Sequence, residues 1–454
     1  DDSSLKEIVF LPKPNPLREA WEGKMYSSEE ASRVSGLRSI VDASEQADFL
    51  NAVRAKKSFT AKSNANATAA VPETIYMLLP DSPQDQEGSR EFRVEAELAA
   101  GLADRKVQNA QPIFAELRHI KSPYELKLLQ HAIDITTEAQ MRSMAMVGRA
   151  KWEYEVQAEV EYTFRRRNAD FWGYPSIVGC GPNATTLHYV ESQSPVKHGE
   201  LLLMDVGAEY DHYTADVTRT FPVNGKFTKE QAEIYQIVYD AQEAAARATK
   251  PGASFGEISA AANEAVANGL LKLGLITDKK QSGMWFIHGL GHWLGMNVHD
   301  VGDYGAPLKA GMVFTNEPGI YIREDAFGKL PDTPAAKAFI EKVRPAFEKY
   351  KNIGVRIEDD MLVTGNGVEW MTKNLPRKLD EVESFMARAS KEMPYTAGIA
   401  QPSFIRQIGS FQTGSPLLAR AERPAGATVR RGIVWSGKRT ALSGDGHVSH
   451  SHSD

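Results

Sequence analysis

The stretch that most constrains the fold of this chain covers residues 201–221 and reads LLLMDVGAEYDHYTADVTRTF. An apolar run ends in Asp205, and Asp216 follows inside a second β-prone run. An unpaired carboxylate at the end of a buried strand costs free energy, so two of them on adjacent strands indicate a cation between them. Taken alone, the stretch is equally compatible with a hairpin that carries two solvated aspartates.

Length and composition limit the class of protein. The 454 residues are enough for two or three domains of roughly 150 residues each. A formal net charge of −6 argues against nucleic acid or an anionic membrane surface as the main partner. No apolar run approaches the ~20 residues of a membrane-spanning helix, so we expect no membrane association.

The compartment is predicted from two weak signals. The chain starts at Asp1 and shows neither the basic nor the apolar region of a signal peptide. Its single cysteine, Cys180, excludes an internal disulfide and suits a reducing compartment, so we expect the cytoplasm. Cys180 lies in the small-residue turn VGCGPN, and we interpret it as a packed residue rather than a catalytic nucleophile.

Residues 1–117 are predicted to form an α/β domain. Short apolar runs at 8–12 and 74–80 stop at proline, as buried strands do. The segment contains no paired acid and base, so a structural or substrate-shaping role is expected. Helices are predicted over residues 28–34 and 43–53, and a loop over residues 62–70.

A second domain is predicted over residues 118–386. Ser122, Pro123 and Glu125 form a capping box with proline at the first helical position, which indicates a long helix. Beyond it, helices alternate with turn-linked strands, which is typical of an α+β fold. Helices are predicted over 154–166, 229–250 and 255–273, and strand-like runs over 311–321 and 354–364.

The last segment, residues 387–454, is rich in glycine, serine, alanine and arginine and has no apolar period. We predict a low-complexity or loosely ordered tail. Its His447, His450 and His452 are more typical of a solvated tail than of a metal site.

Three further segments contain candidate metal ligands. His292 lies in a glycine-rich run that starts at His288, Glu317 precedes a Pro-Gly turn, and Glu358 follows Arg356 by two residues on what we predict to be one strand face. Singly, each has a simpler explanation: a core histidine, a turn residue and a salt bridge with Arg356. Their coincidence with Asp205 and Asp216 favours a metal site.

The combined ligand set is four carboxylates and one imidazole: Asp205, Asp216, His292, Glu317 and Glu358. Such an oxygen-rich set suits Mn²⁺, with Co²⁺, Fe²⁺ or Zn²⁺ as alternatives. Four carboxylates around one divalent ion leave excess negative charge, whereas two ions about 3.5–4 Å apart use them all. Two ions would lower the pKa of a bridging water and polarise a carbonyl, which is the chemistry of acyl-bond hydrolysis without a serine or cysteine nucleophile.

With these residues located, the chain resembles the pita-bread metallopeptidases, and within them the Xaa-Pro aminopeptidases. The resemblance covers residues 8–386 and rests on five motifs in the family's order and spacing. They are LHY at 187–189, MDVGAEYDHYTADVTRTFPVNGKFT at 204–228, HGLGHWLGMNVHDVG at 288–302, NEPGIYI at 316–322 and GVRIEDD at 354–360.

The resemblance implies a role for each site residue. It makes Asp205 a ligand of one metal, His292 and Glu317 ligands of the other, and Asp216 and Glu358 bridging ligands. Glu317 would also be the general base. His188 corresponds to the histidine that stabilises the oxyanion, His299 to the one that contacts the substrate carbonyl, and His288 to a residue lining the proline pocket. Tyr321 and Arg356 correspond to a pair that orients the ligands, a role whose loss typically costs 10–100-fold.

The N-terminal domain departs from the family pattern. The family has further strands before the segment that resembles IVFLPKPNPLREAWEG, so we expect this domain to be incomplete. Lys24 and Met25 occupy positions where close relatives often have arginine. We therefore do not expect this position to contribute a side chain to the site of a neighbouring subunit. An incomplete domain would also expose sheet edges that favour aggregation.

The predicted function is therefore an aminopeptidase that removes the N-terminal residue from peptides with proline second, using a hydroxide between two metal ions. We expect peptide substrates and a homo-oligomer, either a dimer or a tetramer. A prolidase restricted to Xaa-Pro dipeptides is the first alternative, because the two subfamilies share all metal ligands. A non-catalytic binding protein on the same fold is the second, and the presence of all five ligands argues against it.

Overall fold

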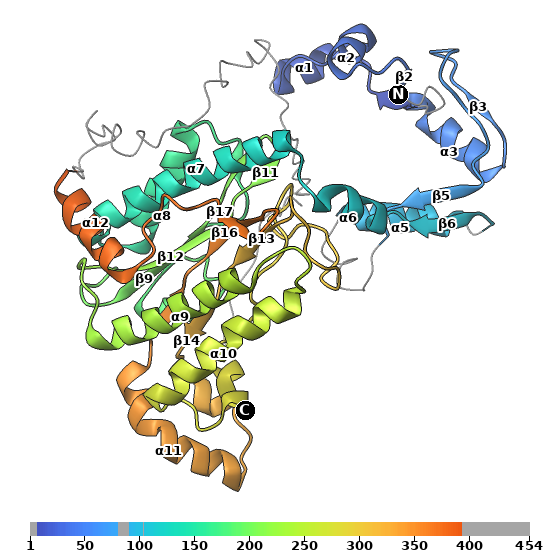
Figure 1. Cartoon of the computed structure of the whole chain (residues 1–454). Coiled ribbons are helices and arrows are strands. Elements are labelled where there is room, and N and C mark those ends of the chain that lie inside the picture. Colours follow the sequence, from blue (N-terminus) through green and yellow to red (C-terminus); the bar gives the residue numbers. More distant parts are fainter. Residues whose placement is uncertain (1–6, 80–89, 103, 393–454) are drawn as a thin grey trace, which may run out of the picture. The chain divides into compact units, whose positions relative to one another are not determined.

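The computed structural model describes residues 7–79, 90–102 and 104–392 (Figure 1). The tail histidines His447, His450 and His452 lie outside these residues. The final described helix, α12, covers Leu379–Glu392, so regular structure continues past residue 386.

The N-terminal part contains two parallel strand pairs, which confirms the α/β prediction. Strand β1 (Val9–Leu11) pairs with β2 (Ile40–Asp42), and β5 (Thr74–Met77) pairs with β6 (Lys106–Asn109). The predicted loop over 62–70 is partly wrong, because β4 (Thr68–Ala69) pairs with β3 (Phe59–Thr60). The helices of this part are α1 (Pro16–Glu22), α2 (Ser28–Ser35), α3 (Gln46–Arg54) and α5 (Arg90–Ala100).

Local sequence explains these helices. Helix α2 begins with a capping box made by Ser27 and Glu30 and ends at Gly36, whose φ of +76° suits glycine. Helix α3 covers one face of the first strand pair, where Phe49 packs against Phe10 and Phe59 with ring centroids 5.5 and 5.3 Å away. The aromatic contacts give this small part its core.

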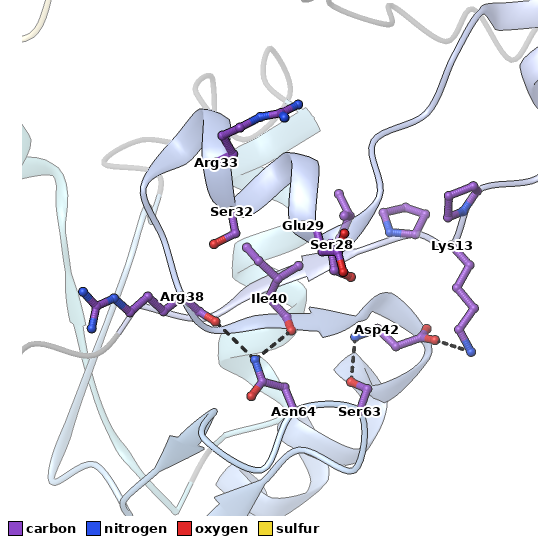
Figure 2. A pocket seen from close by; sticks show the side chains of 13 residues that line it. Lys13, Ser28, Glu29, Ser32, Arg33, Arg38, Ile40, Asp42, Ser63 and Asn64 are labelled. Atoms are coloured by element: carbon purple, nitrogen blue, oxygen red, sulfur yellow. Dashed lines mark hydrogen bonds and ion pairs between the residues drawn. The ribbon is translucent and has the colours of Figure 1, made fainter.

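A hollow of about 600 Å³ lies beside the first strand pair, between α2 and the segment around Asn64 (Figure 2). Lys13 and Asp42 form an ion pair of 2.6 Å there, and Asn64 Nδ2 donates to the carbonyl oxygens of Arg38 and Ile40 at 3.2 Å. Glu29, Arg33 and Arg38 also line the hollow, and the structural or substrate-shaping role expected for this part stays a prediction.

The following part begins with α6 and contains a long helix in the predicted place. The capping box of Ser122 and Glu125 starts α7, as predicted, and Gly274 ends α10 at a φ of +75°. The helices are α6 (Gln111–His119), α7 (Pro123–Met146), α8 (Glu153–Arg166), α9 (Lys229–Ala248), α10 (Phe255–Leu273) and α11 (Pro334–Tyr350). Short 3₁₀ turns cover Ala43–Glu45, Val147–Arg149, Gly181–Thr185, Lys279–Met284 and Ala326–Lys329.

A buried antiparallel sheet holds the two aspartates of the opening stretch. Its strand order is β12 (Val217–Pro222), β9 (Leu201–Val206), β8 (Ile177–Cys180). Asp205 on β9 lies opposite Thr218 on β12, and Asp216 directly precedes β12. All residues of these strands are buried, because helices cover the sheet, which explains the continuous apolar runs.

The two strand-like runs at 311–321 and 354–364 each divide into two strands. Strand β13 (Val313–Asn316) pairs with β16 (Asp359–Val363), and β14 (Gly319–Tyr321) pairs with β15 (Gly354–Arg356). The prediction that Arg356 and Glu358 share one strand face is therefore wrong. Pro318 cannot donate to a ladder, and Glu358 N donates instead to the carbonyl oxygen of Thr218 at 3.1 Å.

The sheets lie between two helix pairs. Figure 1 shows β9, β12, β13 and β16 between α7 and α8 on one side and α9 and α10 on the other. The remaining strands are β17 (Val368–Trp370), which pairs with β16, and the small sheet of β7 (Phe171–Trp172), β10 (Ala208–Tyr210) and β11 (Tyr213–Thr214). Within the described residues, no helix has the length and apolarity needed to cross a membrane.

Candidate metal centre and substrate pocket

The tertiary structure gathers the predicted site residues around one pocket of about 530 Å³. Nine of the ten line it, and the tenth, Tyr321, lies buried behind His288. The nine are His188, Asp205, Asp216, His288, His292, His299, Glu317, Arg356 and Glu358.

Strand ends and strand breaks position the carboxylates. Asp205 lies on β9, and Asp216 directly precedes its partner strand β12. Glu317 lies between β13 and β14, and Glu358 lies between β15 and β16. At each of these breaks the backbone passes from one sheet to another, and both glutamates line the same pocket. The breaks that were unexpected in the sequence are thus the reason why four carboxylates from distant segments meet.

His292 presents one ring nitrogen to these carboxylates. Its Nε2 atom lies 3.2 Å from Asp216 Oδ2 and 3.5 Å from Glu317 Oε1. The other nitrogen, Nδ1, lies 3.1 Å from the carbonyl oxygen of Trp293. One ligand atom from each of Asp216, His292 and Glu358 lies within 4.8 Å of the others, which is the spacing of ligands around a single ion.

Tyr174 belongs to the site and was missed by sequence reasoning. Its Oη lies 2.5 Å from Oδ1 of Asp205 and 2.5 Å from Oδ1 of Asp216. A phenol has one hydrogen to donate, so it satisfies only one of these carboxylates at a time. The sole local signal is its place between Gly173 and Pro175, which is ordinary for a turn.

The charges of the centre do not balance within the chain. Burial, and next the neighbouring Asp205, raise the pKa of Asp216, and burial raises the pKa of Glu317 to about 8. Burial and then the carboxylate of Asp216 raise the pKa of Glu358 well above its usual range. Without cations Glu317 and Glu358 hold protons near neutral pH, whereas divalent ions would stabilise all three groups as carboxylates.

The pKa of the His292 imidazole reflects the same excess of negative charge. Burial lowers the pKa of its imidazole, but the hydrogen bond to Asp216 and the charges of Asp216 and Glu317 outweigh burial and raise it to about 9. Hard oxygen donors, one imidazole and uncompensated negative charge are what divalent cations require, so these residues fit a metal centre.

A hydrogen-bonded relay links the centre to His288. Arg356 Nη2 lies 2.5 Å from Asp205 Oδ2, and its Nη1 donates to Tyr321 Oη at 2.7 Å. Tyr321 Oη lies 2.9 Å from Nε2 of His288, whose Nδ1 lies 2.7 Å from the carbonyl oxygen of Gly289. Burial, and next the charge of Arg356, lower the pKa of His288 to about 4, so the ring is neutral and Tyr321 donates to it.

The other two histidines lie at the opening of the pocket. The ring of His299 contacts that of His292 edge to face, with centroids 4.2 Å apart. Burial, and next the charge of His292, lower the pKa of His299 to about 4. His188 lies on an exposed segment that follows the 3₁₀ turn Gly181–Thr185. Both are therefore available to a ligand in the pocket.

Cys180 does not belong to this chemistry. It is buried, and burial raises the pKa of its thiol to about 12. A thiol that stays protonated is a poor nucleophile, so its interpretation as a packed residue agrees with the structure.

Comparison with known proteins decides the family. Residues 127–365 match the model of metallopeptidase family M24, which is more than half of the chain. The chain belongs to metallopeptidase family M24. M24 membership and the donor set described above mean that the centre binds divalent metal ions.

Similar proteins in this family have a consistent description. The chain is 34% identical to the Xaa-Pro aminopeptidase of Haemophilus influenzae over 392 residues, which are 84% of this chain and 82% of that protein. It is 39% identical to the Xaa-Pro aminopeptidase of Escherichia coli over 293 residues, 62% of each chain. The intermediate cleaving peptidase 55 of Arabidopsis thaliana is 30% identical over 83% of this chain and 69% of its own.

Solved structures agree on the fold. A substrate complex of Escherichia coli aminopeptidase P is 30% identical, has a TM-score of 0.71 and covers 86% of this chain and 84% of that chain. A complex of the same enzyme with the inhibitor Pro-Leu has a TM-score of 0.70 at 30% identity, covering 84% of this chain and 82% of that one. The predicted pita-bread fold is thereby confirmed.

Proposed function

We propose that this chain is a metal-dependent aminopeptidase that removes the N-terminal residue from peptides with proline in the second position. The single observation that supports it most is the convergence of four carboxylates, three of them buried, and Nε2 of His292 on one pocket. The similar proteins named Xaa-Pro aminopeptidase supply the substrate class. A chain with this pocket and these relatives is a peptidase and not a binding protein that has lost its ligands.

Two divalent ions, most simply Mn²⁺, would occupy the centre. Asp205 would bind one ion, His292 and Glu317 the other, and Asp216 and Glu358 would bind both. When bound, the ions supply an activated water molecule and polarise the carbonyl of the scissile bond. Co²⁺, Fe²⁺ and Zn²⁺ are the alternatives for the same hard ligand set.

The chain's own residues would do the remaining work. A carboxylate oxygen of Glu317 would accept the proton of the attacking water, as a general base within the pocket. A neutral His299 would donate an N–H to the substrate carbonyl near proline, and His188 would donate to the oxygen on which negative charge develops. His288 would line the subsite for the proline ring, near the apolar side chain of Val298.

Arg356 and Tyr321 would orient Asp205 and His288 without touching the reacting atoms. Arg356 contacts Asp205 at one end and Tyr321 at the other, and Tyr321 donates a hydrogen bond to Nε2 of the neutral His288. The pair thus joins the metal ligand Asp205 to His288 in the wall of the proline subsite. A displacement of either residue would therefore displace the other.

A homo-oligomer and a cytoplasmic location complete the proposal. The prolidase alternative is less favoured, because the similar proteins of Haemophilus influenzae and Escherichia coli are named Xaa-Pro aminopeptidase. Trp21 on α1 is 89% exposed, and a neighbouring copy of the chain would cover it.

One experiment separates the two peptidases. The Mn²⁺-loaded protein is given Arg-Pro-Pro and Ala-Pro, and the products are identified by mass spectrometry. We expect release of arginine from the tripeptide. The control peptide Arg-Ala-Pro should not be cleaved, and removal of the metal by a chelator should abolish cleavage of Arg-Pro-Pro. Cleavage of Ala-Pro alone would mean a prolidase, and no cleavage of either peptide by protein with two bound metals would contradict a peptidase.

A further inference from the structure

The loop over residues 181–194 carries His188 and is held by apolar packing and by hydrogen bonds, four of them to one buried side chain. His188 itself is exposed, and among the described residues no hydrogen bond or ion pair fixes its ring. Its neighbours Leu187 and Tyr189 pack against the apolar cluster of Ile177, Ala184, Leu203 and Tyr321. The place of the His188 ring in the pocket is therefore set by the course of the loop.

Glu153, in the first turn of α8, binds this loop at both ends. Its side chain is fully buried. Oε1 accepts from the backbone N–H of Cys180 at 2.7 Å and from Nδ2 of Asn183 at 3.0 Å. Oε2 accepts from the hydroxyl of Tyr189 at 2.8 Å and from the backbone N–H of Ser194 at 2.8 Å. Two donors precede His188 in the chain and two follow it.

The charge of Glu153 makes these contacts strong. Some other buried carboxylates contact cations, as Glu138 contacts Arg167 and Asp359 contacts Arg219. Within the described residues, Glu153 forms no ion pair and depends on its four donors. A buried carboxylate without a cation is costly unless every oxygen is satisfied, so displacement of the loop carries a free-energy penalty.

The backbone of Glu153 strengthens the same connection. Its N–H donates to the carbonyl oxygen of Ser194 at 3.0 Å, and Val196 N donates to the carbonyl oxygen of Lys151 at 2.9 Å. The start of α8 and the end of the loop are thus joined by backbone as well as side chain, and the carboxylate extends this junction to the beginning of the loop.

We propose that Glu153 is a positioning residue that fixes the 181–194 loop and thereby sets the place of His188 over the substrate pocket. Glu153 does not line the pocket and does not touch substrate, so it acts through His188. The proposal rests on the proposed function for its effect on the reaction, but its effect on the loop is independent of any substrate.

The test is a double-mutant cycle between Glu153→Gln and His188→Ala, with Arg-Pro-Pro as substrate. A glutamine keeps the size of the side chain but turns an N–H₂ toward donors, and Ser194 N–H cannot accept from it. We expect Glu153→Gln to lower kcat about 10- to 100-fold with unchanged metal content. In the His188→Ala background the same substitution should change kcat less than about twofold, because the group it positions is absent.

Glu138→Gln is the matched control, since Glu138 is a buried glutamate on α7 that contacts Arg167 and not the loop. It should leave kcat unchanged. If Glu153→Gln does not fold, Tyr189→Phe removes one of the four donors and should give a smaller loss with the same dependence on His188. Equal losses in both backgrounds, or none in either, would overturn the proposal.

Hydrogen–deuterium exchange of the metal-loaded protein tests the loop itself. Peptides covering residues 181–194 should exchange faster in Glu153→Gln than in the parent chain and in Glu138→Gln, because glutamine keeps only one acceptor oxygen and the N–H of Ser194 loses its acceptor. Unchanged exchange overturns the proposal whatever the protein cleaves. A parent chain that fails to cleave Arg-Pro-Pro contradicts only the proposed function.

Discussion

His292 Nε2 lies 3.2 Å from Oδ2 of Asp216, on the opposite side of the ring from the nitrogen that contacts the carbonyl oxygen of Trp293. A carbonyl accepts and never donates, so in the neutral imidazole Nδ1 holds the hydrogen and Nε2 offers its lone pair toward Asp216. The Trp293 carbonyl thus selects the tautomer that a metal ligand needs, and the two residues form one side of a preorganised cation site.

Replacing Asp216 with asparagine should abolish turnover. The substitution removes one charge from the centre and turns an amide toward Tyr174 or His292, so we expect kcat/KM for Arg-Pro-Pro to fall at least about 100-fold. Metal content is measured on the same samples. Asp332→Asn, an exposed residue with the same change of charge, is the control. Parental rates with parental metal content would rule out the two-metal centre.

Metal binding should release protons, and affinity should fall as the pH is lowered. The pKa of Glu317 is raised to about 8 and that of His292 to about 9 in the metal-free chain, so both hold protons at pH 7. A cation must displace these protons to bind, which costs free energy that grows as the pH falls below these values. Calorimetric titration with Mn²⁺ in buffers of different ionisation enthalpy measures the release. Identical heats in all buffers at pH 7 would contradict the prediction.

Tyr321→Phe should lower kcat/KM about 10- to 100-fold without loss of metal. Within the part of the chain that the structure describes, the phenol alone links Arg356 Nη1 to His288 Nε2, and both atoms lose this partner when it is removed. Tyr350→Phe is a suitable control, because Tyr350 is also buried but its hydroxyl contacts Glu233 outside the pocket. The expectation fails if both variants keep the parental rate.

Asp300→Asn should destabilise the segment that contains His299. The Asp300 side chain is fully buried between Arg118 and Lys121, and Lys121 is itself 1% exposed. Removing the carboxylate leaves a buried cation unpaired, for which we expect a loss of about 3 kcal/mol in the free energy of unfolding. Urea unfolding monitored by the fluorescence of the tryptophans, among them the nearby Trp293, measures it. Asp303→Asn, on the same loop but exposed, should change stability by less than about 1 kcal/mol.

Local rules predicted several of the helices, and the motifs predicted the candidate ligands. Ser122 and Glu125 are close in sequence, and their capping box acts over one turn, so α7 begins where it was predicted. The candidate ligands were found because carboxylate and imidazole are rare at strand ends and in glycine-rich turns. The division of the second part of the chain into sheets was not predictable in this way, because Pro318 and Glu358 interrupt strands that read as continuous.

Tyr174 and Glu153 could not be found in the sequence. Tyr174 contacts Asp205 and Asp216, which lie 31 and 42 residues further along the chain. Glu153 has four donors, all from a segment 27 to 41 residues away. At the sequence level each has an ordinary interpretation, a turn tyrosine and an acid in the first turn of a helix, and nothing nearby distinguishes them.

The sequence by itself determined the chemical type of this protein: an oxygen-rich ligand set with one imidazole, ordered in motifs that resemble one family. Only the tertiary structure decided how the ligands meet, which histidine nitrogen faces them, and which side chains hold Asp205 and His188 in place. The physical reason is that ligand identity is a property of single residues. Burial, hydrogen-bond partners and charge balance are properties of contacts between segments, and these exist only after the chain has folded.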